Sequence, residues 1–435
     1  MKVVIMAGGK GTRISSLTND IPKPLLKVGG RPVLELEIEC LKKQSFNDFI
    51  ITVSYMADKI MDYFGDGSRF GVKIAYFIEE EPLGNAGALF KLREQLKEDF
   101  LLLNADVIFD IDVKRFVDYH KTKGGLVTLF THPNNHPYDS GLLIADEEGR
   151  VLDWLTKEGS RPKWYQNRVN AGLHIISPKV LDLAKIDEKL IGQEVDGKIL
   201  KVDLDRQLLK PLAGTGLMYC YDSPEYVKDM GTPKRYYAVN EDYLKGKVQS
   251  RNLKNKQRAI FLDRDGTINK YVGFLRRLED FELLPASSKG IRKINESGYL
   301  AIVITNQPVI ARGEVSYEEL REIHNKMETL LGEAGAYIDG LYFCPHHPDK
   351  GFDGEISSLK IVCDCRKPKP GLLLKAAKDF NIDLKSSWMV GDDLIDIKAG
   401  KAAGCKTALI GNNDYGQDLS ITDINDFVEK VLVRP

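Results

Sequence analysis

The sequence predicts an α/β protein with two doubly wound, Rossmann-like domains, and three observations support this prediction. The 435 residues are enough for two or three domains. Short apolar runs alternate with segments of helical spacing in both halves of the chain. Glycine-rich or acidic turns follow several of these runs, and such sheets bind their ligands at the carboxyl ends of the strands.

The composition is ordinary for a soluble globular protein, with 43% hydrophobic and 29% charged residues. The net charge of −1 provides no basic field, so we expect neither nucleic acid nor membrane as a partner. No apolar run approaches about 18 residues, and the N-terminus lacks a cleavable signal pattern. Six cysteines in so long a chain do not suggest a disulfide framework. We therefore expect a cytoplasmic protein, and the sequence leaves its oligomeric state open.

Strands and helices alternate along the first half of the chain. Apolar runs bounded by turn residues predict strands, and apolar residues at helical spacing predict helices. The predicted elements are strand 2–6, helix 33–43, strand 49–54, helix 57–64, strand 72–78, helix 86–96 and strand 100–104. Asp106 follows the last of these strands, which places a carboxylate at the carboxyl edge of the predicted sheet.

A glycine-rich loop follows the first strand. Gly8, Gly9 and Gly11 lack the Cβ atoms that would keep a ligand away from the backbone. Their N–H groups can surround phosphate oxygens, and Arg13 adds a forked positive charge. Lys23 stands between two prolines, which restrict its backbone. The pattern favours a phosphate-binding loop, with an ordinary turn and a solvated lysine as the alternative.

Several motifs in this half occur in a fixed order. Together they resemble the sugar-1-phosphate nucleotidylyltransferase family over about residues 1–240, with Asn104-Ala105-Asp106 in place of the more usual Asn-Gly-Asp. Lys157 stands where the family has a phosphate-binding lysine, although its neighbours differ from the family pattern. The other matching stretches are 7–13, 22–24, 81–88, 170–172 and 229–233.

This resemblance implies a transfer reaction, in which a sugar 1-phosphate attacks the α-phosphorus of a nucleoside triphosphate and pyrophosphate leaves. It also implies Mg²⁺ held by Asp106 and Asp229, because hard oxygen ligands suit this ion. Arg13 and Lys23 would neutralise the triphosphate and the charge that develops during transfer. The implied substrate-binding residues are Gly8, Gly9, Gly11, Glu81, Gly84, Lys157 and Asn170.

A basic stretch separates the two halves. Residues 244–257 contain several lysines, no acid and few apolar residues. We interpret them as a solvated linker, and a basic patch for an anionic ligand is the alternative. The predicted domains are therefore 1–243 and 258–435.

The second half repeats the alternation. The predicted elements are strand 259–262, helix 287–297, strand 299–304, helix 317–331, strand 341–343, helix 372–379 and strand 388–390. Asp263 and Asp265 follow the first strand, Thr305 follows the second, and Asp392 and Asp393 follow the last. Two carboxylates at i and i+2 on a strand end point the same way. Lys367 lies in a rigid stretch between prolines and basic residues.

This ordered set resembles the haloacid dehalogenase superfamily over about residues 258–412. The resemblance makes Asp263 the nucleophile that accepts the phosphoryl group, and Asp265 the general acid and later the base. Thr305 would bind the phosphoryl oxygens, and Lys367 would balance their charge. Mg²⁺ would be held by Asp263, Asp265 and Asp392, with Asp393 or Asp396 in support.

A narrower resemblance concerns the residues around the first acids and after Thr305. Arg264, Asn269 and the stretch 306–313 are similar to a subfamily of heptose-bisphosphate and histidinol-phosphate phosphatases, whose members often carry a zinc loop. Asn306, Arg312 and Arg366 are then expected to bind substrate. The resemblance implies a closed, structural zinc site, with His347 as an alternative ligand and reduced, buried cysteines as the alternative to metal. Its ligands would be Cys344, His346, Cys363 and Cys365.

The two halves together suggest consecutive reactions on one sugar. The resemblances imply a D-glycero-D-manno-heptose 1,7-bisphosphate 7-phosphatase fused to a heptose-1-phosphate nucleotidylyltransferase, with GTP as the preferred triphosphate. One alternative keeps both enzymes but uses mannose or another hexose 1-phosphate, with a histidinol-phosphate-type phosphatase. Another alternative makes the first domain a non-catalytic sugar-nucleotide sensor.

Overall fold

A computed structural model describes residues 1–9, 11–18, 20–156, 159–195 and 197–433. The contacts divide the chain into two compact units, which we treat separately. Unit 1 comprises Met1–Thr131, Leu143–Trp154 and Asn170–Asn252, and unit 2 comprises His132–Leu142, Leu155–Val169 and Leu253–Pro435. The sequence-based domains 1–243 and 258–435 and the linker 244–257 remain predictions.

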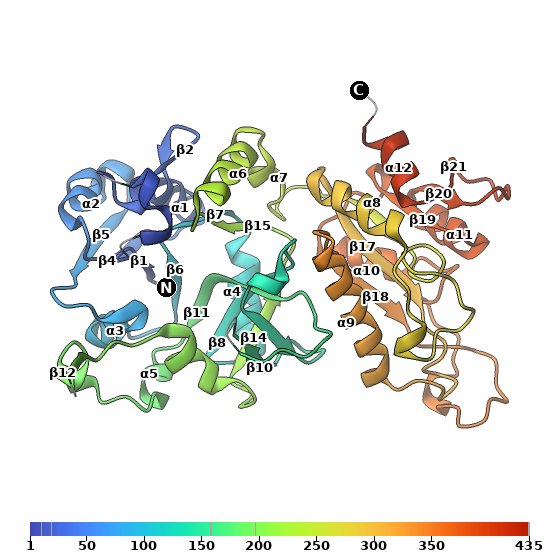
Figure 1. The fold of residues 1–435 in the computed structure, drawn as a ribbon, viewed down its shortest axis with the longest axis horizontal. Coiled ribbons are helices and arrows are strands. Elements are labelled where there is room, and N and C mark those ends of the chain that lie inside the picture. The colour runs from blue at the N-terminus through green and yellow to red at the C-terminus, as the bar shows by residue number, and fades with distance from the viewer. Residues whose placement is uncertain (10, 19, 157–158, 196, 434–435) are drawn as a thin grey trace. The chain divides into compact units, whose positions relative to one another are not determined.

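Unit 1 is built on a mixed sheet with the strand order β10-β9-β11-β6-β1-β4-β5 (Figure 1). Strand β8 also pairs with β11, and β14 pairs with β8. The strands are β1 (Val3–Met6), β4 (Asp48–Val53), β5 (Lys73–Ile78), β6 (Phe100–Asn104), β8 (Val127–His132), β9 (Leu142–Ala145), β10 (Val151–Leu155), β11 (Val169–Ile176) and β14 (Met218–Asp222). Strand β1 pairs in parallel with both β4 and β6, whereas β11 is antiparallel to β6.

Helices cover both faces of this sheet because successive side chains of a strand point to opposite sides. Val3 and Ile5 of β1 pack in one core with α1, α2 and α4, and Val4 packs in the other core with α3 and α5. The helices of the unit are α1 (Val33–Lys42), α2 (Ala57–Phe64), α3 (Gly84–Lys91), α4 (Val113–Lys123), α5 (Lys179–Leu183), α6 (Pro233–Leu244) and α7 (Lys247–Ser250).

Three short strand pairs complete unit 1. They are β2 (Lys27–Val28) with β3 (Arg31–Pro32), β7 (Val107–Asp110) with β15 (Tyr226–Asp229), and β12 (Glu194–Val195) with β13 (Lys198–Ile199). The antiparallel pair β7 and β15 sets Asp229 opposite Val107, directly after Asp106.

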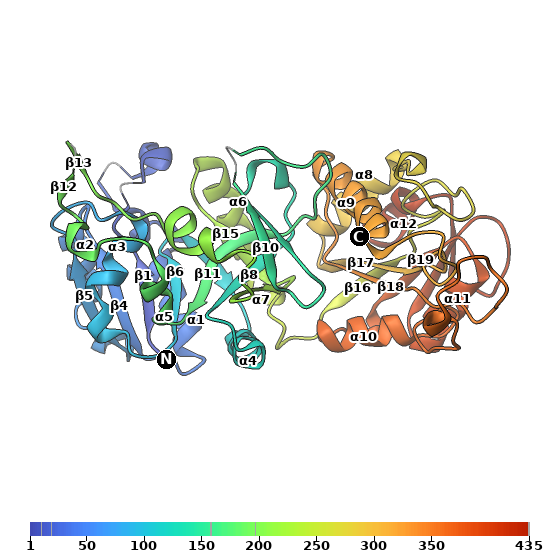
Figure 2. The ribbon, with the colours of Figure 1, turned by 90° about the horizontal axis from the view of Figure 1, so that it is seen from below.

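Unit 2 is built on a parallel six-stranded sheet with the order β18-β17-β16-β19-β20-β21. Figure 2 shows α8, α9 and α12 on one face and α10 and α11 on the other. The elements are β16 (Arg258–Leu262), α8 (Pro285–Glu296), β17 (Tyr299–Asn306), α9 (Tyr317–Glu333), β18 (Gly340–Cys344), α10 (Gly371–Asp379), β19 (Trp388–Gly391), α11 (Leu394–Ala403), β20 (Lys406–Ile410), β21 (Leu419–Ile421) and α12 (Ile424–Val431).

The structure confirms the predicted α/β class and places the strands and helices close to the predicted ranges. The predicted helix 86–96 is shorter: α3 begins at Gly84 and ends at Lys91, and a separate turn follows at 93–95. The resemblance at 170–172 implied a strand start, and β11 covers these residues, whereas β8, β9, β10 and β14 had no counterpart in the sequence prediction. Among the described residues, no helix combines the length and the apolar character that a membrane crossing requires.

Candidate active sites

Three neighbouring strands of unit 2 end at the predicted phosphatase residues. The parallel register sets Leu262 of β16 beside Val303 of β17 and Val390 of β19. The residues that follow are therefore brought to one edge of the sheet, as the sequence predicted. The N–H of Asp263 donates to the carbonyl oxygen of Val390 at 2.9 Å, which fixes the acid at the strand end.

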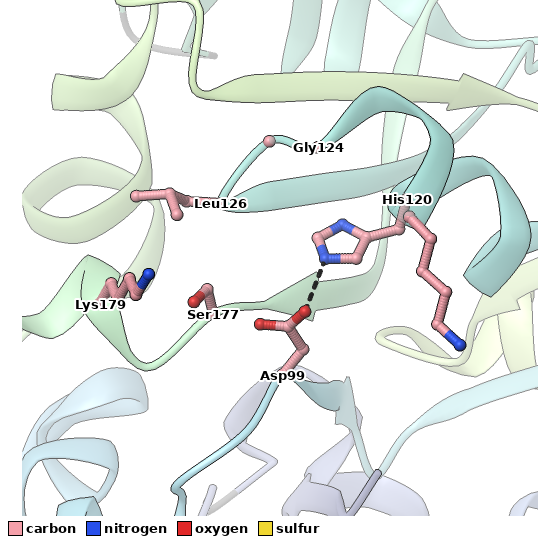
Figure 3. A pocket seen from close by; sticks show the side chains of 8 residues that line it. Asp99, His120, Gly124, Leu126, Ser177 and Lys179 are labelled. Carbon is pink, nitrogen blue, oxygen red and sulfur yellow. Dashed lines mark hydrogen bonds and ion pairs between the residues drawn. The ribbon is translucent and has the colours of Figure 1, made fainter.

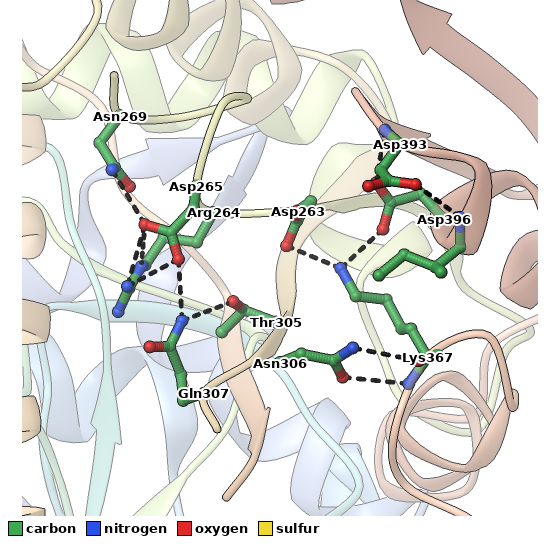
Figure 4. A network of polar contacts seen from close by, with 11 residues as sticks. Asp263, Arg264, Asp265, Asn269, Thr305, Asn306, Gln307, Lys367, Asp393 and Asp396 are labelled. Carbon is green, nitrogen blue, oxygen red and sulfur yellow. Dashed lines mark hydrogen bonds and ion pairs between the residues drawn. The ribbon is translucent and has the colours of Figure 1, made fainter. Parts of the chain in front are cut away.

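Lys367 lies at the centre of this edge and is almost fully buried (Figure 4). Its Nζ lies 2.7 Å from Asp263 Oδ1 and 2.7 Å from Asp396 Oδ1. Burial raises the pKa of Asp263, and the neighbouring Asp396 adds to the rise while Lys367 opposes it. The carboxylates of Asp263 and Asp396 therefore compete for one ammonium group in a site with little solvent.

A third carboxylate completes the cluster. Ligand oxygens of Asp263, Asp392 and Asp396 all lie within 4.8 Å of one another. Gly266 has a φ of +84°, and a Cβ there would lie 2.1 Å from Asp392 Oδ2, so only glycine fits against this acid. Burial raises the pKa of Asp392 to about 6.

This cluster suits a divalent cation. Three carboxylates face the single ammonium of Lys367, which leaves two formal negative charges at the sheet edge. Mg²⁺ prefers such oxygen ligands, and its charge would offset the excess. Asp393 has another role, because it caps α11 and accepts from Ile395 N at 3.2 Å.

Asp265 lies outside the acidic cluster and has its own partners. Arg264 Nη2 donates to both of its oxygens at 3.0 and 2.7 Å. Asn269 Nδ2 donates at 3.0 Å, and Gln307 Nε2 donates at 2.9 Å both to Asp265 and to Thr305 Oγ1. Burial would raise the pKa of Asp265, but the charge of Arg264 and these hydrogen bonds lower it. Binding of magnesium by the Asp265 side chain remains a prediction.

The predicted substrate residues lie around the same edge. Asn306 donates to the carbonyl of Lys367 at 3.1 Å and accepts from its N–H at 3.0 Å, which anchors the lysine loop. Arg366 Nη1 donates to the His346 carbonyl at 3.3 Å. The Arg312 guanidinium contacts two aromatic rings, with centroids 4.0 Å away at Phe274 and 4.5 Å away at Phe352.

The predicted zinc ligands converge. Sγ of Cys365 lies 3.2 Å from the sulfurs of Cys344 and Cys363, and 3.2 Å from Nδ1 of His346. Three sulfurs and one imidazole nitrogen within 4.8 Å of one another fit a tetrahedral structural site. His347 is not in the cluster, and its Nε2 lies 3.4 Å from Arg312 Nη2 instead.

The residues predicted for the nucleotidyl transfer site lie at the carboxyl ends of β1 and β6 in unit 1. Lys23 Nζ forms an ion pair with Asp106 Oδ2. Asp229 lies next to Asp106 through the β7 and β15 pairing, and both of its oxygens lie 3.0 Å from Arg235 Nη1. Burial would raise the pKa of Asp229, but Arg235 and the N–H of Gly231 lower it. The carboxylates of Asp106 and Asp229 are oxygen ligands of the kind that Mg²⁺ prefers.

The glycine loop lies beside these acids. A Cβ at Gly11 would lie 3.6 Å from Cβ of Lys23, and a Cβ at Gly231 would lie 3.4 Å from Arg13 Nη2. The loop and its two predicted cations are thus beside the acid pair. Gly84 begins α3 with a φ of +80°, and a Cβ there would lie 2.4 Å from the Val202 carbonyl oxygen.

The remaining predicted residues of the first site differ in their surroundings. Gly8 is partly exposed and Gly9 is exposed at the end of β1, and Glu81 is also exposed. Asn170 is the second residue of β11, and its Oδ1 accepts from Gly172 N at 3.2 Å and from His174 Nε2 at 3.0 Å. Lys157 lies outside the described residues.

Two acids of this site were not predicted. Glu37 on α1 is buried and accepts from Val107 N at 3.2 Å, and burial and the charge of Asp106 hold its pKa well above the usual range. Glu79 follows β5, and its Oε1 would lie 3.2 Å from a Cβ at Gly8. Burial raises the pKa of Glu79. A carboxylate after a predicted strand was a signal for Glu79, whereas nothing in the sequence marked Glu37.

A further pocket of unit 1 contains none of the predicted residues (Figure 3). His120 is buried there, with Nδ1 2.7 Å from Thr128 Oγ1 and Nε2 3.2 Å from Asp99 Oδ2. Both ring nitrogens therefore have protein partners, and we interpret this group as structural.

Comparison with known proteins agrees with this geometry. Residues 2–246 match the Nucleotidyl transferase family, and residues 364–429 match a HAD hydrolase-like family. The D-glycero-beta-D-manno-heptose-1,7-bisphosphate 7-phosphatase of Haemophilus ducreyi is 38% identical over 184 residues, which are 40% of this chain and 98% of the relative.

Two further relatives match longer parts of the chain. A UTP–glucose-1-phosphate uridylyltransferase of Synechocystis is 32% identical over 401 residues, which are 84% of this chain and 94% of the relative. A mannose-1-phosphate guanyltransferase of Debaryomyces hansenii is 32% identical over 252 residues, which are 56% of this chain and 65% of the relative.

The fold and the two sites thus define a bifunctional enzyme of sugar-phosphate chemistry, with a nucleotidyltransferase and a haloacid dehalogenase-type phosphatase. The chain belongs to the Nucleotidyl transferase family, and a heptose bisphosphate phosphatase-like domain is fused to it. This confirms both resemblances predicted from the sequence and the prediction that the chain is an enzyme.

Proposed function

We propose that the chain catalyses two consecutive reactions on one sugar. The second domain removes the phosphate at C7 of D-glycero-D-manno-heptose 1,7-bisphosphate. The first domain joins the resulting heptose 1-phosphate to a nucleotide, with GTP preferred, and releases pyrophosphate. The observation that carries this proposal is the Asp263, Lys367 and Asp396 cluster beside Asp265, in a domain whose relative is named for this phosphatase reaction.

In the phosphatase reaction, an oxygen of Asp263 attacks the phosphorus and the sugar oxygen leaves. Asp265 gives its proton to that oxygen, and later takes a proton from the water that hydrolyses the aspartyl phosphate. Because Asp265 is held ionised in the free protein, the approaching phosphate dianion must raise its pKa before it can donate. Lys367 and Thr305 hold the phosphoryl oxygens. Mg²⁺ bound by Asp263 and Asp392 would neutralise phosphate charge.

In the transfer reaction, Arg13 and Lys23 neutralise the triphosphate while the sugar phosphate oxygen attacks the α-phosphorus. Mg²⁺ bound by Asp106 and Asp229 would supply further charge neutralisation. Lys157, Glu81 and Asn170 remain proposed contacts to the sugar phosphate.

Glu79 supports the preference for GTP. Guanine presents two neighbouring N–H donors on one edge, which a single carboxylate can accept together. Glu79 lies against Gly8 at the glycine loop, and its protein donor is the N–H of Leu83. We expect Glu79→Gln to lower kcat/KM for GTP about 10- to 100-fold, since a bidentate contact contributes about 1–3 kcal/mol. Glu80→Gln is the matched control, because Glu80 is exposed. Equal losses with GTP, UTP and ATP would contradict this assignment.

A hexose is the second candidate for the sugar substrate. The uridylyl- and guanyltransferase relatives are named for glucose and mannose 1-phosphate, which favours a hexose as the alternative substrate of the first domain. Phosphate release from heptose bisphosphates and histidinol phosphate, followed by pyrophosphate release with each triphosphate, separates the candidates. The proposal fails if no heptose phosphate is turned over.

We also propose that zinc fills the cysteine and histidine cluster and that the enzyme acts in the cytoplasm. The described cysteines form no disulfide, which supports both statements, because reduced cysteines bind zinc and persist in a reducing compartment.

A further inference from the structure

Arg264 stands between the two acids of the phosphatase motif, and its side chain is completely buried. A buried guanidinium must be paired, since an unpaired buried charge is very costly. Its Nε lies 3.2 Å from Asp265 Oδ1, and its Nη2 donates to both carboxylate oxygens. This forked arrangement fixes the plane of the Asp265 carboxylate as well as its charge.

The remaining nitrogen of Arg264 has a different partner. Nη1 lies 3.1 Å from Nε2 of His324, a buried residue in the middle of α9 (Figure 4 shows Arg264 and Asp265). An arginine has only donors, so Nε2 of His324 must be the acceptor and its ring proton must be on Nδ1. The imidazole is therefore neutral in this contact. Burial lowers the pKa of His324 well below its usual value, and the charge of Arg264 acts in the same direction.

We propose that His324 is a positioning residue for the general acid of the phosphatase: it holds Arg264 so that Arg264 can orient Asp265. The inference rests on the role of Asp265 in the proposed phosphatase reaction. His324 does not touch the substrate in this account. It fixes the third nitrogen of the Arg264 guanidinium, whose other two nitrogens both contact the acid.

His324 lies on a different element of the fold from Arg264 and Asp265. Asp265 and Arg264 lie in the turn after β16, whereas His324 comes from α9, whose N-terminus is fixed by a capping box of Ser316 and Glu319. The ring of Phe343 on β18 lies 5.7 Å from the imidazole and limits its orientation. The position of the acid thus depends on a helix as well as on its own loop.

The effect on catalysis follows from the chemistry of the leaving group. An alkoxide is a poor leaving group and needs a well-aligned acid, whereas an aryl oxide leaves readily without one. General acid catalysis contributes about 10²- to 10⁴-fold, and a displacement of about 1 Å can cost about 10²-fold. A disturbed Asp265 should therefore slow the hydrolysis of alkyl phosphates far more than that of aryl phosphates.

The test compares kcat/KM for a sugar bisphosphate and for p-nitrophenyl phosphate, since this ratio reports the steps up to departure of the alcohol. We expect His324→Leu to lower kcat/KM about 10- to 100-fold for the sugar phosphate and less than about 3-fold for the aryl phosphate. His324→Gln retains an acceptor and should recover most of the loss. Met327→Leu, a buried neighbour on the same helix, controls for packing and should change neither value.

The outcomes are distinguishable. If both substrates slow equally, or if His324→Gln is no better than His324→Leu, the positioning role is wrong. If the wild-type protein hydrolyses neither substrate, the proposed phosphatase function fails first. Should His324→Leu not fold, nitrogen NMR of the wild-type histidines decides: the inference requires a proton on Nδ1 of His324, and a proton on Nε2 overturns it.

Discussion

At the scale of single residues, the charges around Lys367 illustrate how the phosphatase site is held together. Its ammonium group is buried with Asp263 and Asp396, each at 2.7 Å. Removing one partner of a buried ion pair leaves the other charges uncompensated. The free energy that this costs exceeds the stabilisation that the intact pair provides. The same residue is therefore expected to matter for both stability and catalysis.

Replacing this lysine tests that expectation. Lys367→Met should abolish phosphate release and lower the free energy of unfolding of the second domain by about 3–5 kcal/mol, measured by urea denaturation without Mg²⁺. Lys369→Met is the matched control, because Lys369 is exposed and pairs with exposed Asp364 at 3.0 Å. The control should change the free energy by less than about 0.5 kcal/mol. Similar stability of both variants would show that the buried ion pairs are not needed.

His174 provides a prediction on pH dependence. Burial lowers its pKa to about 3, below the value of about 6.5 in an unfolded chain. Between these values the unfolded state binds the proton and the folded state does not, so stability falls as the pH falls below about 6.5. The slope reaches about 1.4 kcal/mol per pH unit. Urea denaturation from pH 7 to 5 should show this fall in the wild type, and a shallower one in His174→Gln. The same pH dependence of stability in the wild type and in His174→Gln would contradict this role of His174.

At the scale of elements, the strand ends carry most of what the sequence could predict. Asp263 and Asp392 follow parallel strands and Thr305 lies in the last residues of another. Parallel strands end at one edge, so the proximity of these residues followed from local patterns. Long-range contacts could not be predicted in this way. The pairing of β11 with β6, and the burial of Glu37 beside Asp106, depend on segments far apart in the chain.

The cysteine loop was predicted as a set of ligands, but not in its geometry. The resemblance implied Cys344, His346, Cys363 and Cys365 as zinc ligands, and it left His347 as an alternative to His346. The structure brings His346 to the three sulfurs, while His347 lies next to Arg312. Side-chain direction within two adjacent residues is decided by packing, which no spacing rule contains.

Metal removal tests this loop. A zinc chelator that spares Mg²⁺ should make the loop 344–365 sensitive to trypsin at Lys350 or Lys360, because three thiols and an imidazole hold its ends. Cys363→Ser should lower the zinc content, measured by mass spectrometry of the metal, while Cys40→Ser should not. Freshly reduced wild-type protein without zinc would end this assignment.

At the scale of the whole molecule, the chain combines two chemistries that can share one sugar. The first unit pairs Lys23 with Asp106 at the proposed triphosphate site, and the second pairs Lys367 with Asp263, the proposed nucleophile. The proposed function sets an order, in which the phosphatase removes the phosphate at C7 before the transferase uses the remaining 1-phosphate.

The most direct test supplies the wild-type enzyme with D-glycero-D-manno-heptose 1,7-bisphosphate, GTP and Mg²⁺, and follows phosphate and pyrophosphate together. We predict that phosphate appears first and pyrophosphate after a lag. Asp263→Asn should release neither from the bisphosphate, yet release pyrophosphate when heptose 1-phosphate is added. Asp106→Asn should release phosphate alone. Phosphate release by Asp263→Asn, or no pyrophosphate from any sugar 1-phosphate and triphosphate, would contradict the account.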